Sequence, residues 1–140
     1  MVEFALVVGA FLLVTFAAVA AAFHSIQRAM AETAAAAGVQ IAASGSPGSP
    51  NVPDLAGAFQ PTNALLKSVM FGTTIVSVPA GQPCGQVSQP GTIDVCVYPD
   101  GDLVAETVRG RPAFPVSGIT RVLPWSIDVT VEMHQVSYQP

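Results

Sequence analysis

Charged side chains are scarce in this chain: they make up 10% of its 140 residues, against roughly 25% in ordinary soluble proteins. The five basic residues are scattered and the formal net charge is −4. Because binding to nucleic acid needs clustered cations, the composition argues against a nucleic-acid partner. Arg109 and Arg111, which flank Gly110, are predicted to lie in a solvated turn and not in an anion site.

The chain has two cysteines and two histidines. A tetrahedral metal site would use four thiolate or imidazole ligands, and the redox motif C-x-x-C is absent. Cys84 and Cys96 are therefore predicted to form a disulfide across a short loop, which places this part of the chain in an oxidising compartment. No metal site and no cofactor are expected.

Proline is absent from the first 46 residues, and all twelve prolines lie at Pro47 or later. The same 46 residues carry three formal charges, on Glu3, Arg28 and Glu32. This division predicts that the two parts of the chain are surrounded by different solvents.

A run of twenty residues without a charge extends from Phe4 to Phe23. As a helix it would be about 30 Å long, which matches the hydrocarbon core of a membrane. A cleaved secretory signal is the alternative, but it would begin with basic residues and end at an A-x-A-like site. The chain instead begins Met-Val-Glu, and its helical pattern continues beyond the apolar run, so we expect the segment to be retained.

The residues after Phe23 are rich in alanine and become amphipathic. One narrow apolar stripe has helical spacing and comprises Ile26, Met30, Ala34, Ala37 and Ile41. Breaker residues end the pattern from Ser44 onward. We predict one helix over 1–43, a Gly/Ser/Pro linker over 44–54 and a β-rich extracytoplasmic domain over 55–140.

In the C-terminal half, apolar residues recur at every second position instead of at helical spacing. A short helix is allowed around Leu66, broken upstream by Pro61, and strands follow. Their ranges are 73–78, 92–98, 103–108 (paired with 92–98 through a turn at Pro99-Asp100-Gly101) and 126–138. In the last strand Ile127, Val129, Val131 and Met133 should face the core. The predicted fold class is α+β, a long N-terminal helix with a small antiparallel sheet domain.

No set of residues indicates an enzyme. His134 lies on the polar side of an alternating strand, so it is expected to face solvent and not to serve a catalytic triad. The Asp100-Gly101-Asp102 sequence lacks the spaced ligands of a calcium loop and is better explained by a hairpin turn. His24 is expected at a membrane interface or helix contact, and Trp125 to anchor the core or an interface.

Glu3 is the most informative single residue, because a carboxylate at the edge of an apolar span is unfavourable unless it is paired or reaches the interface. The start MVEFALVVGAFLLV, with Glu3 and Phe4 directly before a long aliphatic helix, resembles the N-terminus of type IV pilins, most closely the TadE-like pilins of tight-adherence systems. Glu3 stands third here, whereas the family's glutamate is usually the fifth mature residue. The resemblance implies that Glu3 neutralises an N-terminal amine during subunit docking.

The resemblance implies a structural subunit that polymerises through its N-terminal helix into a pilus on the cell surface. The partners it implies are other copies of the chain, a prepilin peptidase and the assembly machinery of the inner membrane, where the subunit would reside before assembly. Small residues such as Ala5 and Gly9, spaced four apart, suit close helix packing. Two alternatives stay open: a minor (priming or tip) pilin, and a single-pass surface protein whose domain binds a ligand or surface.

Overall fold

The computed structural model describes residues 2–49, 51–86, 89–113 and 125–135, except for the side chains of Val2 and Glu3. Two helices, α1 (Val2–Ser44) and α2 (Leu55–Val69), precede all the described strands along the chain. The strands are β1 (Thr74–Ser77), β2 (Thr92–Asp100), β3 (Leu103–Arg111) and β4 (Ile127–His134). They form one sheet in the order β1-β2-β3-β4, so the α+β class with a long N-terminal helix is confirmed.

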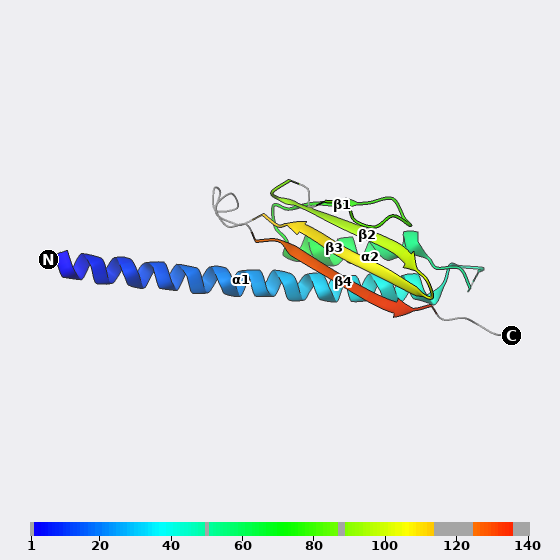
Figure 1. Cartoon of the computed structure of the whole chain (residues 1–140), viewed down its shortest axis with the longest axis horizontal. Helices are drawn as coiled ribbons and strands as arrows, with labels where there is room; N and C mark the ends of the chain where they lie inside the picture. Colours follow the sequence, from blue (N-terminus) through cyan, green and yellow to red (C-terminus); the bar gives the residue numbers. More distant parts are fainter. Residues whose placement is uncertain (1, 50, 87–88, 114–124, 136–140) are drawn as a thin grey trace.

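The long helix is unbroken over 43 residues, which confirms the prediction from the absence of proline. At 1.5 Å per residue it is about 65 Å long. Its first half projects from the rest of the molecule and its second half lies against the sheet (Figure 1). Asp54 N donates to Ala42 O at 3.0 Å, so the chain turns back immediately after the helix.

Both helices cover the same face of the sheet, here called the inner face. α1 contacts β3 and β4, and α2 contacts β1 and β2. Small residues of α1 allow the close approach, because Ala31, Ala34 and Ala35 are buried against the inner face. The sheet contributes the larger inward side chains, namely Ile93, Val95, Val97, Val104, Val108, Ile127 and Val129.

The second helix corrects the expectation at Pro61. That residue lies inside α2 instead of preceding a shorter helix. The Asp54 carboxylate accepts a hydrogen bond from Gly57 N at 2.9 Å and caps the helix start. Ala58, Thr62 and Leu66, four residues apart, are fully buried. Their packing offsets the one helical hydrogen bond that Pro61 cannot donate.

The sheet is mixed, which corrects the prediction that it is antiparallel throughout: β1 pairs with β2 in parallel. Residues 78–91 separate these strands, enough chain for a parallel crossover. The other pairs, β2–β3 and β3–β4, are antiparallel. The predicted β2–β3 hairpin is confirmed, with Gly101 at a φ of 62° in its turn.

The last described strand confirms its predicted register. Ile127 and Val129 are buried, and Val131 and Met133 are partly buried against the core. The alternate residues, from Asp128 to His134, are exposed. The predicted strand range also includes residues 136–138, which lie outside the described residues.

Candidate functional site: the helix surface and its attachment to the domain

The projecting half of α1 exposes large apolar side chains around its whole circumference. Phe4 is 76% exposed, and the others are Leu6, Val7, Val8, Phe11, Leu12, Leu13, Val14, Phe16 and Val19. Thr15 is the only polar residue between Phe4 and Phe23, and its hydroxyl donates to Phe11 O at 2.8 Å. The helix is therefore long and apolar enough to span a membrane.

The predicted assembly residues lie at the free end of this surface. Gly9 is open, since a Cβ placed there would meet no atom within 4 Å, so another helix could approach its backbone closely. Glu3 lies in the first turn of α1. Its side chain, and Met1 with the terminal amine, lie outside what the structure describes, so their pairing stays a prediction.

The predicted apolar stripe on the second half of α1 is split between two environments. Ala34 is buried under the domain, whereas Ile26, Met30 and Ile41 are 54%, 41% and 38% exposed. The domain covers a neighbouring face of small residues instead, because only these allow a helix to approach the sheet closely. Three large apolar side chains in the second half of α1 thus remain uncovered by the described residues.

His24 marks the place where α1 meets the domain. Its ring lies 5.1 Å from that of Trp125, measured between centroids, with 39° between the ring planes. Both residues are half-buried. His24 therefore lies where α1 contacts the segment that leads into β4, with Trp125 at the same interface, and a membrane-interface position for His24 stays a prediction.

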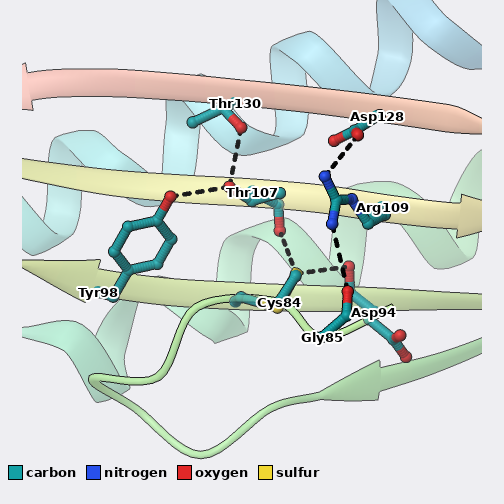
Figure 2. A network of polar contacts seen from close by, with 9 residues as sticks. Cys84, Gly85, Asp94, Tyr98, Thr107, Arg109, Asp128 and Thr130 are labelled. Carbon is teal, nitrogen blue, oxygen red and sulfur yellow. Dashed lines mark hydrogen bonds and ion pairs between the residues drawn. A yellow bond between two sulfur atoms is a disulfide. The ribbon is translucent and has the colours of Figure 1, made fainter. Parts of the chain in front are cut away.

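Cys84 and Cys96 form the predicted disulfide, with their Cα atoms 5.4 Å apart. Cys96 lies on the outer face of β2, away from the helices, and is fully buried. The bond holds the β1–β2 connection over that face (Figure 2). A closed loop of this length contributes about 3 kcal/mol by restricting the unfolded chain.

Polar side chains line the outer face beside the disulfide (Figure 2). The hydroxyls of Thr107 and Thr130 lie 2.9 Å apart. Arg109 donates to Gly85 O at 3.2 Å and to Asp128 Oδ2 at 2.7 Å, and the Asp128 hydrogen bond is the main cause that raises the pKa of Arg109. The predicted solvated turn at Arg109 is therefore wrong: the residue lies on β3 and ties the connection to β4.

A carboxyl group is buried on the inner face of the sheet. Glu106 of β3 is 0% exposed, and burial raises its pKa to about 8, against an opposing effect of the Thr62 hydrogen bond. Sequence reasoning did not single it out. The available signal was its place in the alternation Val104, Glu106, Val108, which puts it among inward-facing residues.

A polar hollow of about 340 Å³ lies at the end of the sheet, lined by Asn51, Gly101, Asp102, His134 and Gln135. His134 is exposed there, as expected for the polar side of β4. Among the described residues no three His, Cys, Asp or Glu side chains gather in a way that could hold a metal ion. The hollow offers an Asp–His pair and backbone groups, which suit weak polar contacts.

No family model, curated protein or solved structure matches this chain. Its long apolar helix and small disulfide-bonded sheet domain are compatible with a pilin-like architecture.

Proposed function

We propose that this chain is a structural, non-enzymatic subunit that polymerises through α1 into a pilus-like extracellular filament, after residing in a membrane through the same helix. The exposed apolar surface of α1 carries the proposal. Ten large apolar side chains are exposed between Phe4 and Val19. At roughly 1 kcal/mol each, keeping them in water would cost about as much as the stability of a whole domain.

Lipid or further copies of α1 can cover this surface, and the second half of the helix favours copies. A membrane anchor needs about 20 apolar residues. The uncovered side chains of Ile26, Met30 and Ile41 lie beyond that length, next to the domain. Neighbouring helices in a filament would cover them as well, whereas a bilayer reaching only to Phe23 would not.

Glu3 provides the sharpest test. Glu3→Ala should abolish or strongly reduce fibres, because it removes the carboxylate that would guide docking onto an N-terminal amine, while the domain should still fold. Sheared surface material is examined by electron microscopy, and membrane fractions are checked for the Cys84–Cys96 disulfide by thiol labelling. Glu132→Ala is the matched control, since Glu132 is an exposed carboxylate on β4.

Normal fibres from Glu3→Ala would remove Glu3 from the mechanism. A wild-type chain that stays monomeric in its native membrane and never forms fibres would overturn the proposal. That result would favour the second candidate, a membrane-anchored binding protein, for which the polar hollow at Asp102 and His134 is the specific observation.

A further inference from the structure

The buried Glu106 carboxyl group lies where three elements meet. It projects from β3 toward Thr62 of α2 and Gly38 of α1. Thr62 is fully buried, and Gly38 is buried as well. We call this contact of Glu106, Thr62 and the α1 segment 34–38 the Glu106 joint.

The hydrogen bonds of the joint depend on where one proton lies. Thr62 Oγ1 is 2.5 Å from Glu106 Oε1, 3.1 Å from Ala34 O and 3.2 Å from Ala58 O. A hydroxyl has one hydrogen to donate. If Glu106 is ionised, all three neighbours of the hydroxyl are acceptors and only one of them can receive its hydrogen. If Glu106 is protonated, it donates to Thr62 Oγ1, and Thr62 donates onward to a helix carbonyl.

The surroundings of the second carboxyl oxygen also favour a protonated Glu106. Glu106 Oε2 is buried and has no hydrogen-bond partner among the described residues. It faces Gly38, where the absence of a side chain creates the space that it occupies. A buried carboxylate with no counter-ion and one oxygen without a partner is strongly unfavourable, so such a group remains neutral instead.

We infer that Glu106 is a proton-dependent lock between α1 and its domain: protonated, it joins β3 through Thr62 to α1, and loss of the proton opens this joint while the sheet stays folded. The lock would operate whether α1 polymerises or only anchors the chain in a membrane.

Within the described part of the chain, no other charged group faces Glu106 and could account for a pH-dependent opening of the joint. On α1, Arg28 and Glu32 are exposed and pair with each other at 3.3 Å. Lys67 of α2 is exposed, and Asp54 caps the start of that helix. On the neighbouring strands, Asp94 and Tyr98 of β2 and Asp128, Glu132 and His134 of β4 alternate with the inward residues and lie on the outer side.

The direction of the pH effect follows from the two states. In the closed joint the pKa of Glu106 is about 8, and in an opened joint exposed to water it returns to its ordinary value of 4.5. The closed state therefore binds the proton more tightly. Opening should be rarest below pH 4.5, should become about tenfold more frequent per pH unit above it, and should level off above pH 8.

Amide hydrogen exchange of the full chain in detergent micelles tests the lock. Protection factors for residues 34–42 of α1 should fall by about two and a half orders of magnitude between pH 5 and 8. Near pH 8 these amides should exchange faster than those of β2 and β3. Glu106→Gln, whose amide can donate to Thr62 Oγ1 without titrating, should abolish the pH dependence. Glu132→Gln, a substitution on the exposed side of β4, should retain it.

A wild-type profile that matches Glu106→Gln would overturn the inference, and so would joint and sheet amides that exchange together at every pH. The infrared band of a protonated carboxyl group provides a second measurement that needs no variant. That band should be present in the wild-type chain at pH 6 and lost above pH 9. Its absence at pH 6 would show that the joint is held without the proton.

Discussion

Replacing Gly38 with alanine tests how closely α1 must approach the sheet. A methyl group at this position would overlap Glu106 Oε2, Glu106 Cδ and Thr62 Oγ1. Glu106 and Thr62 are both 0% exposed, so neither side chain can move aside into solvent. Either the Glu106 carboxyl group loses its hydrogen bond with Thr62, or α1 moves away from the sheet.

The expected loss can be worked out from three contributions. Overpacking a buried site costs about 1–3 kcal/mol. Breaking the Thr62–Glu106 hydrogen bond adds about 1 kcal/mol. Alanine returns up to about 1 kcal/mol through its better helix propensity. Gly38→Ala should therefore destabilise the chain by about 1–3 kcal/mol.

The assay is denaturant unfolding of the full chain in detergent micelles, followed by the fluorescence of Trp125, the single tryptophan. Gly9→Ala is the matched control. It makes the same exchange in the same helix at a position where the new methyl group meets nothing. This control should leave stability unchanged or raise it by up to about 1 kcal/mol.

A double variant shows whether Gly38→Ala destabilises the chain by crowding Glu106 or for another reason. Glu106→Ala removes two of the three atoms that the new methyl group would strike and leaves Thr62 Oγ1, so Gly38→Ala should cost clearly less when it is added to Glu106→Ala. The resulting coupling energy should be at least about 1 kcal/mol, within the range known for residues in contact. An unchanged penalty in the Glu106→Ala background, or a Gly38→Ala chain as stable as the wild type, would refute the close approach.

Two further predictions concern the domain. Replacing Cys84 and Cys96 with alanine should lower the free energy of unfolding by about 3 kcal/mol and make the unfolding midpoint insensitive to reductant; a midpoint equal to that of the oxidised wild type would contradict the role of the disulfide. Asp54→Ala should cost about 1 kcal/mol in the same unfolding assay through loss of the α2 cap, whereas Asp54→Asn, which can still accept from Gly57 N, should be close to neutral.

The long helix and the last strand could be predicted because their signals are local. An alanine-rich stretch without proline can hardly form anything but a helix, and the alternation from Ile127 to Met133 has one consistent buried side. The disulfide followed from the shortage of other partners for two cysteines. None of these inferences required knowledge of what each element packs against.

The features that were missed depend on tertiary contacts. The direction of β1 is not encoded in its own period, because parallel and antiparallel strands alternate alike. The burial of Ala34 in place of Met30 depends on which face of α1 the sheet covers, and a sheet that approaches closely selects small side chains over large ones. Glutamate is a residue type that usually lies on the surface. The buried position of Glu106 is possible only because Gly38 and Thr62, which are distant in sequence, make room for it and bind it.

The unbroken path of α1 also determines how the chain would respond to mechanical force. The same helix extends from its projecting end to its contacts with β3 and β4, and these strands run obliquely along it (Figure 1). Tension applied along the helix axis would load the helix–sheet interface in shear, so that many contacts must yield together. A break near Phe23 would instead concentrate the load on a flexible connection. Because α1 is continuous, a pull on its projecting end would be transmitted directly to the folded domain.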